Sequence, residues 1–153
     1  MLYENTNEQL CENLKLLNKN ALKLIKSLNK AITIDLNRNI NQLSENEIEI
    51  LETLANRFNR TVNILIDKVL RNLDILELED IFSTLDIIMR TEKRGIVDNF
   101  KTLVQIKNLR NQFIQEDIEE ELIPIFKEII EKTPKLLQII ENVNSYIEGK
   151  GFC

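Results

Sequence analysis

Apolar residues recur along this chain at the three- and four-residue intervals that are typical of amphipathic helices. Residues 8–32 carry a narrow apolar seam in which intervals of four and three residues alternate. The seam consists of Leu10, Leu14, Leu17, Ala21, Leu24 and Leu28. It is short for a coiled coil, so we predict a bundle helix whose seam faces one partner helix, within the chain or across a dimer. The polar residues 33–43 are predicted to connect it to the next helix.

The most regular pattern begins at Ser44 and continues to Leu73. Ser44 and Glu47 have the spacing of a capping box, in which each side chain bonds a backbone N–H group of the first turn. The apolar residues behind them share one face of a helix, within an arc of about 120°. They are Ile48, Leu51, Leu54, Ala55, Phe58, Val62, Leu65, Ile66, Val69 and Leu73. This pattern predicts a helix roughly 45 Å long.

A shorter helix is predicted after a linker over residues 74–80. Asp80 is placed to cap its start, and Gly95 is placed to end it in the left-handed conformation that glycine adopts readily. Its expected inner face consists of Ile81, Leu85, Ile88, Met89 and Glu92. Asp98 would then cap the following helix.

The next helix is predicted over residues 100–117, and one residue in it conflicts with simple core packing. The apolar residues on one side of its helical wheel are Leu103, Ile106, Phe113 and Ile114. Arg110 is expected near the centre of the same side. Because a guanidinium stays charged, it needs a carboxylate, a carbonyl, water or a ligand beside it. Gln115, Glu116 and Asp117 are predicted to end or kink the helix.

The last apolar stripe covers residues 118–148 and continues through Pro134. Its members are Leu122, Ile125, Phe126, Ile129, Thr133, Leu136, Leu137, Ile140, Val143 and Ile147. This segment is either one helix kinked at Pro134 or two nearly collinear helices. Strand patterns are missing from the sequence. We therefore predict an all-α fold, an up-and-down four-helix bundle with one additional short helix, in a single domain over residues 1–153.

Composition narrows the classes of function. The formal net charge of −5 argues against a wide surface for duplex nucleic acid, although it leaves room for a local basic patch. Two cysteines, Cys11 and Cys153, are too few for a disulfide framework and predict a reduced, cytoplasmic chain. No apolar run is long enough to span a membrane, and the Asn-rich start is unlike a signal peptide.

The sequence contains no histidine. This absence excludes catalytic triads and dyads that use histidine and zinc sites that contain it. Glycine-rich phosphate loops are missing as well, because the clustered glycines, Gly149 and Gly151, lie at the C-terminal end. We therefore predict no metal and no cofactor.

Arg110 and Asn111 are the leading candidates for a site. In one interpretation Arg110 pairs with an acid of a neighbouring helix as a fixed structural feature. In the other, the two residues point into a cleft and meet a phosphate or a partner chain. Gln115 lies one turn beyond Asn111, but it is about 140° from Arg110 on a regular helix. Gln115 and Arg110 would converge only if the helix ends there or a second chain contributes.

Two clusters of charge have simpler interpretations. The acidic residues 116–121 point in different directions on a helix, so they suit a solvated helix start better than a metal or acid–base site. The cations around Gly95 are Arg90, Lys93, Arg94, Lys101 and Lys107. Two interpretations stay open. These cations form a modest basic patch that binds RNA or an acidic partner, or they are dispersed over a soluble surface.

Three segments in this order resemble the HepT-like proteins, the nucleotidyltransferase substrate-binding proteins of the HEPN group. The sequence LSENEIEILETLANRFNRTVNILIDKVL resembles the long second helix of that family. IFSTLDIIMRTEKRGIVDNF resembles its short helix and Gly-Ile turn. LRNQFIQEDIEEELIPIFKEIIEKTPKLLQIIENV resembles its motif helix and final helix. The resemblance spans most of the chain and implies a homodimer that binds a minimal nucleotidyltransferase.

The family motif consists of an arginine, usually an asparagine after it, then a histidine and often a tyrosine. Arg110 and Asn111 match the motif, whereas Gln115 stands at the place of the histidine and Asp117 at the place of the tyrosine. The resemblance assigns ribonuclease catalysis to the arginine and histidine, and modification by AMP to the tyrosine. Glutamine cannot act as a general base near neutral pH, and aspartate has no phenol. The motif therefore predicts a member without either activity.

The leading hypothesis is a non-catalytic nucleotidyltransferase-partner protein of a HepT-like toxin–antitoxin-type pair. Arg110, Asn111 and Gln115 would line the cleft where the acceptor or partner docks, with a nucleotide or RNA contact. The alternative is a divergent HEPN-type ribonuclease that works through Arg110 by electrostatic stabilisation. A purely structural helical interaction module is the third hypothesis.

Overall fold

The computed structural model describes the backbone of residues 2–153 and the side chains of residues 6–153. This part of the chain contains helices and no strand, which confirms the all-α class. The α-helices are α1 (Leu2–Ala31), α2 (Glu45–Asn63), α3 (Arg71–Leu76), α4 (Thr84–Lys93), α5 (Phe100–Gln115) and α6 (Leu122–Gly149). A π-helical segment, Ile64–Leu70, joins α2 to α3 without a break. Short 3-10 turns, Ile40–Gln42 and Glu119–Glu121, precede α2 and α6.

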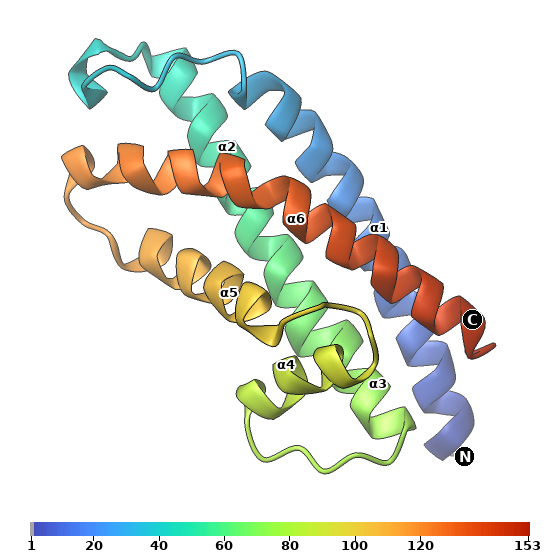
Figure 1. Ribbon diagram of the computed structural model, residues 1–153. Coiled ribbons are helices and arrows are strands. Elements are labelled where there is room, and N and C mark those ends of the chain that lie inside the picture. The colour runs from blue at the N-terminus through green and yellow to red at the C-terminus, as the bar shows by residue number, and fades with distance from the viewer. Residues whose placement is uncertain (1) are drawn as a thin grey trace.

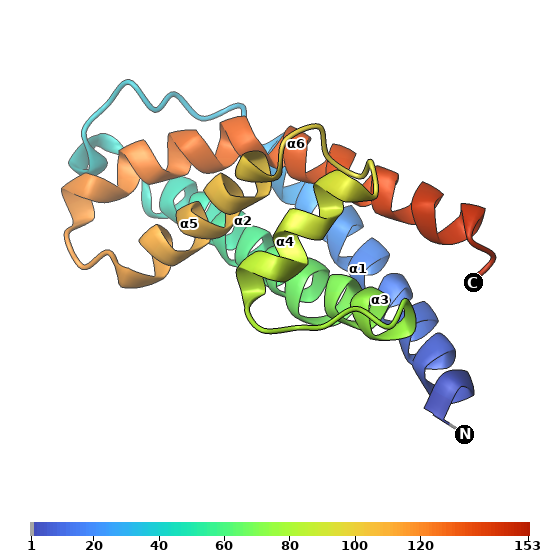
Figure 2. The same ribbon diagram turned by 60° about the horizontal axis from the view of Figure 1, so that its bottom comes forward.

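Helices α1, α2 and α6 form the long part of the molecule (Figure 1). Helix α1 packs against α2, the π segment, α3 and α6. Helix α5 lies between α6, α2 and the short helix α4, and α4 also packs against the π segment. Both ends of the chain lie at the same end of the molecule (Figures 1 and 2). The continuous helix from α2 to α3 therefore contacts every other α-helix along its length.

All six α-helices contribute to one buried apolar cluster, whose largest side chains are Phe58 and Phe126. The predicted seam of α1 faces this cluster, with Leu28 only partly buried. The stripe predicted for residues 44–73 is also buried, apart from the half-buried Ile48 at its start. Both predicted stripes are confirmed.

The start of α2 is fixed by the predicted capping box. The Glu47 N–H group donates to Ser44 Oγ at 3.0 Å, and the Ser44 N–H group donates to Glu47 Oε1 at 3.0 Å. The predicted end of this helix is wrong, because the helical backbone continues beyond Leu73 to Leu76. Asp74 was assigned to a linker and instead lies on the buried side of the helix.

The predicted cap of α4 is also wrong, and its predicted inner face is only partly confirmed, since Ile88 is buried. Ser83 caps the helix in place of Asp80, and its Oγ atom accepts the Asp86 N–H group at 3.3 Å. Ser83 and Asp86 form a capping box, which is a stronger local start signal than Asp80 alone. The helix therefore buries Ile87, Ile88 and Thr91, and of the predicted face Leu85 and Met89 are 48% and 42% exposed.

The predicted role of Gly95 is confirmed. Gly95 has a φ of +73°, and the Ile96 N–H group donates to the Thr91 carbonyl at 2.9 Å, which is the pattern of a Schellman motif.

The cap of α5 is Asn99, one residue after the predicted Asp98, and its side chain accepts the Lys101 N–H group at 3.0 Å.

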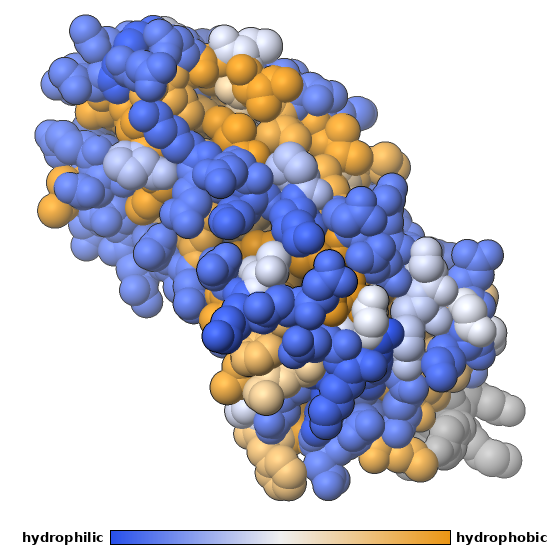
Figure 3. Space-filling view, in the orientation of Figure 1, coloured by the Kyte–Doolittle hydropathy of each residue, from blue (hydrophilic) through white to orange (hydrophobic). Residues whose placement is uncertain are grey.

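Leu78 ends α3 in the same left-handed conformation, which a residue with a Cβ atom adopts less readily than glycine. It has a φ of +58°, and the Glu79 N–H group donates to the Asp74 carbonyl at 2.8 Å. The side chain of Leu78 is 75% exposed, and that of Phe82 in the same loop is 87% exposed. Figure 3 shows apolar side chains at the lower end of the molecule, where this loop lies.

These two left-handed positions give a paired prediction. Gly95→Ala is expected to lower the free energy of unfolding by about 1 kcal/mol, because no atom lies within 4 Å of the new Cβ and the backbone strain acts alone. Leu78→Gly is expected to raise it by about 0.5–1 kcal/mol, because the strain is removed at the cost of chain entropy. Urea denaturation measures both. Gly149→Ala in α6, where φ is not positive, is the control and should not destabilise.

The last stripe forms a single helix, α6, which runs through Pro134. Thr133 Oγ1 donates to the Ile129 carbonyl at 2.6 Å in the turn before the proline, and Pro134 itself is exposed. Helix α5 ends at Gln115, and a 3-10 turn leads into α6. Of the two predicted outcomes, an end or a kink of the helix at residues 115–117, the structure shows the end.

Cys11 of α1 and Cys153 form a disulfide, with Cα atoms 5.6 Å apart. The prediction of reduced cysteines is therefore wrong. Its basis was the count of cysteines, which says nothing about the closeness of the two ends of the chain.

Over the described residues, no helix has the length and apolar character needed to cross a membrane.

Candidate functional site

The core face of α5 differs from the predicted one by one residue. Leu103, Ile106 and Leu109 are buried, whereas Ile114 is 63% exposed. Leu109 was left out of the predicted stripe. Because it enters the core, Arg110 is turned to the border of the core face and is half-buried instead of central.

Amide oxygens hold the Arg110 guanidinium in place. Its Nε and Nη2 atoms donate to Asn111 Oδ1 at 3.2 and 3.0 Å, and Nη1 donates to Asn63 Oδ1 of α2. Across the described residues, no carboxylate lies within 4.0 Å of this guanidinium. The interpretation of Arg110 as a member of a structural ion pair is therefore wrong. Three of its five N–H groups are used, and its charge is not neutralised.

Arg110 and Asn111 face an open groove of about 730 Å³. Its walls come from three parts of the chain that are far apart in sequence, namely α1, the continuous helix of α2 and the π segment, and α5. The lining residues are Leu16, Lys19, Asn20, Lys23, Arg60, Asn63, Ile64, Asp67, Lys68, Arg110, Asn111 and Ile114. We call this the Arg110 groove. The sequence pointed to Arg110 and Asn111 but gave no signal that α1 and α2 would supply the other walls.

Gln115 does not share the Arg110 groove. It is exposed and lines a separate hollow of about 440 Å³ together with Glu116, Glu121 and Glu128. Within one chain, the structure thus brings together Arg110 and Asn111 but not Gln115. The angle of about 140° between Arg110 and Gln115 on a regular helix explains this separation.

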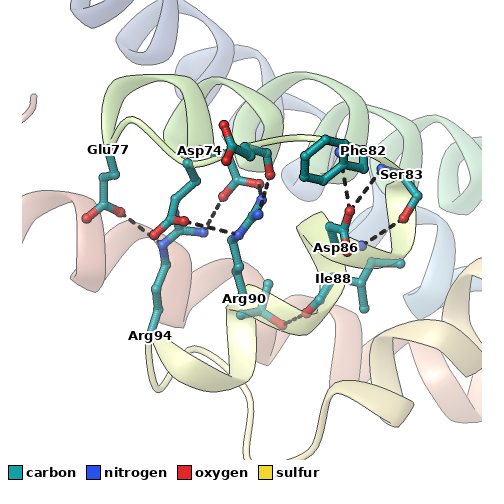
Figure 4. A network of polar contacts seen from close by, with 11 residues as sticks. Asp74, Glu77, Phe82, Ser83, Asp86, Ile88, Arg90 and Arg94 are labelled. Carbon is teal, nitrogen blue, oxygen red and sulfur yellow. Dashed lines mark hydrogen bonds and ion pairs between the residues drawn. The ribbon is translucent and has the colours of Figure 1, made fainter.

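The predicted basic patch around Gly95 is interrupted by an ionic network (Figure 4). Arg90 Nη1 and Arg94 Nη1 donate to the two oxygens of Asp74 at 2.8 and 2.7 Å. Arg94 Nε also donates to Glu77 at 2.9 Å. Arg90 and Arg94 are therefore structural cations that attach α4 to α3, and they do not contribute to a free basic surface.

Burial and charge act in opposite directions in this network. Burial by itself would lower the pKa of Arg94, but the hydrogen bond and the attraction to Asp74 raise it above the ordinary value. Burial raises the pKa of Tyr146, and so does its hydrogen bond of 2.9 Å to Glu77. The network thus fastens α3, α4 and α6 with charged arginines and a neutral tyrosine.

The described residues include no group of three or more carboxylate, thiol or imidazole side chains arranged to hold a metal ion. Comparison of the chain with protein-family models, with curated proteins and with solved structures finds no match. The Arg110 groove and the sequence are therefore the features of this chain that bear on its function.

Proposed function

We propose that this chain is a non-catalytic partner of a small nucleotidyltransferase, in the manner of the HepT-like proteins, with the Arg110 groove as its docking cleft. The observation that supports this most is the unneutralised Arg110 guanidinium, held by Asn63 and Asn111 at the wall of an open groove. Such a preorganised guanidinium fits a phosphate or a carboxylate of a partner.

The absence of catalytic chemistry supports the non-catalytic part of the proposal. The chain has no histidine, and Gln115 lies outside the groove. An up-and-down four-helix bundle with one additional short helix is part of the same proposal, because the family has that architecture. The proposal also includes a cytoplasmic location. A reducing cytoplasm would open the Cys11–Cys153 disulfide.

The partnership is tested by co-purification. We expect the neighbouring gene to encode a small nucleotidyltransferase. The tagged chain should elute together with that protein when the two are expressed together. Arg110→Ala should weaken the complex about tenfold or more, because a charged hydrogen bond is lost. Lys135→Gln on the exposed side of α6 is the matched control and should have no effect. Separate elution of the two wild-type proteins would contradict the partnership.

The proposal includes a homodimer, and the exposed face of α1 supports it. Leu22 and Ile25 of α1, and Ile32 just beyond its end, are 64%, 38% and 58% exposed. Light scattering after size exclusion is expected to give twice the chain mass of 18.0 kDa. Leu22→Glu should give a monomer, whereas Leu85→Glu at an exposed apolar position of α4 should not. A strict monomer for the wild type at micromolar concentration would count against the dimer.

Asp67 favours one second candidate function, a divergent HEPN-type ribonuclease. Its carboxylate lines the same groove as Arg110 and is exposed, so it offers a base beside an electrostatic stabiliser. Degradation of a labelled RNA by the wild type, lost in Arg110→Ala and in Asp67→Asn, would support this candidate. Equal background cleavage by all three proteins would end it.

A further inference from the structure

Exposed apolar side chains gather on the loop between α3 and α4 and on the first turns of α4, at the lower end of the molecule in Figure 3. Five of the eleven large apolar side chains that are exposed over the described residues fall within residues 75–89. We call them the Phe82 patch, which consists of Ile75, Leu78, Phe82, Leu85 and Met89. Single exposed apolar residues are ordinary, but a group on one loop and the helix after it is typical of a surface that another molecule covers.

The fold does not use the side chain of Phe82. Phe82 precedes the cap Ser83, a position from which an apolar side chain commonly packs on the fourth residue of the helix. That residue is Ile87, which is completely buried, whereas Phe82 is 87% exposed. Leu78 also presents its side chain to solvent, and it does so in a left-handed backbone conformation that is strained for residues with a Cβ atom. Core packing therefore accounts for neither side chain.

The backbone that carries these side chains is held by polar contacts (Figure 4). Asp86 Oδ2 accepts the Phe82 N–H group at 3.2 Å. Arg90, which belongs to the buried ionic network, also donates through Nη2 to the Asp80 carbonyl. The network that attaches α4 to α3 thus also holds the loop between them. Because the loop is already ordered in the free protein, binding a partner there costs little conformational entropy.

The charge around the patch is negative. Residues 74–94 contain six carboxylates and three cations, so their net formal charge is −3. Every charged side chain between Ile75 and Met89 is a carboxylate. Asp80 is exposed, and across the described residues no cation pairs with its carboxylate. A border of this sign repels the phosphates of lipids and nucleic acids and attracts lysine and arginine.

We propose that the Phe82 patch binds an amphipathic helix of another protein, with apolar side chains bordered by lysine or arginine. The apolar side of that helix would cover Leu78 and Phe82, and its cations would lie against Glu79 and Asp80. The described part of the chain has no strand edge to which a partner strand could be added, so the apolar face of a helix is the binding mode that fits. None of the patch residues lines the Arg110 groove, so this surface goes beyond the docking cleft proposed above.

The test is isothermal titration of the full chain, without any nucleotidyltransferase, against three short synthetic peptides. The first consists of leucine and lysine at helical spacing, the second has glutamate in place of every lysine, and the third has serine in place of every leucine. The first should bind with a Kd below about 100 μM, and the other two at least about tenfold more weakly, because each lacks one of the two features. No binding of the first peptide, or equal binding of any two, would overturn the proposal.

Variants locate the binding. Phe82→Ser should weaken binding of the leucine–lysine peptide about tenfold or more, and Asp80→Asn about two- to fivefold. Because the Phe82 side chain is exposed, its variant keeps the fold, which a thermal melt checks. Ile118→Ser is the matched control, since Ile118 is also exposed and is followed by the carboxylates of residues 119–121, but it lies in a different loop. An equal effect of Ile118→Ser and Phe82→Ser would contradict the assignment to the patch.

A lipid surface and a second copy of the chain are the other occupants that the experiment distinguishes. Sedimentation with vesicles of phosphatidylcholine, with or without phosphatidylglycerol, should leave the protein in the supernatant. Light scattering should give the same mass for Phe82→Ser as for the wild type. Vesicle binding that Phe82→Ser abolishes, or a lower mass for that variant, would overturn the proposal, because lipid or a second copy would then cover the patch.

Discussion

Asp74→Ala is expected to lower the free energy of unfolding by about 3–5 kcal/mol, because it leaves two arginines without their shared buried partner. The Asp74 side chain is completely buried, and the side chains of Arg90 and Arg94 are only 16% and 8% exposed. Neither guanidinium can lose its charge to avoid the cost. For a chain of this size, the change corresponds to a fall in Tm of roughly 10 °C. Urea denaturation and thermal melts measure it.

Glu79→Ala is the matched control for Asp74→Ala. Glu79 also pairs with Arg90, but at 3.5 Å, and its side chain is 50% exposed. An ion pair in that position contributes about 0–1 kcal/mol. If Asp74→Ala and Glu79→Ala had similar small effects, the network in Figure 4 would not be what attaches α4 to α3. Asp74→Asn separates charge from shape, since it keeps the size of the side chain and removes one anionic partner.

Reduction of the Cys11–Cys153 disulfide is the second large expected effect. The bond joins residues 142 positions apart, so it closes almost the whole chain into one loop. A cross-link of this length restricts the unfolded chain strongly, and its loss is expected to lower the free energy of unfolding by about 2–5 kcal/mol. Urea denaturation with and without a reductant measures the change.

The double variant Cys11→Ser/Cys153→Ser is the control for reduction. Its unfolding midpoint should equal that of the reduced wild type and should not respond to the reductant. Because the α1 seam around Cys11 stays buried in either state, helix content should be retained on reduction. Two free thiols in the purified protein, with the same midpoint in both conditions, would show that the bond does not form in solution.

Local signals in the sequence were sufficient for much of the fold. The capping box at Ser44, the left-handed Gly95 and the apolar stripes of α1 and α2 depend on residues three or four positions apart, which a helix brings together by itself. The predicted cap at Asp98 was one residue before the observed cap, Asn99, and the predicted cap at Asp80 was three residues before Ser83. Ser83 with Asp86 could have been recognised by the same spacing as Ser44 with Glu47.

The candidate site was predictable only in part. Arg110 and Asn111 stood out because a guanidinium appeared among apolar residues, and they do line a groove. The omission of Leu109 placed Arg110 too deep by about one residue of helical rotation. The other walls of the groove come from α1, α2 and the π segment, and no local pattern reports a backbone that changes from i+4 to i+5 bonding.

The sequence by itself determined that the chain is helical, that α2 begins after Ser44 and α4 ends before Gly95, and which apolar faces of α1 and α2 enter the core. It also excluded histidine chemistry. The tertiary structure decided how far each helix is turned about its axis and which distant segments meet. That decision buried Asp74 between two arginines, joined Cys11 to Cys153, and gathered five cations in one groove. The physical reason is that helix formation depends on neighbours within one turn, whereas the approach of distant side chains depends on the packing of the whole core.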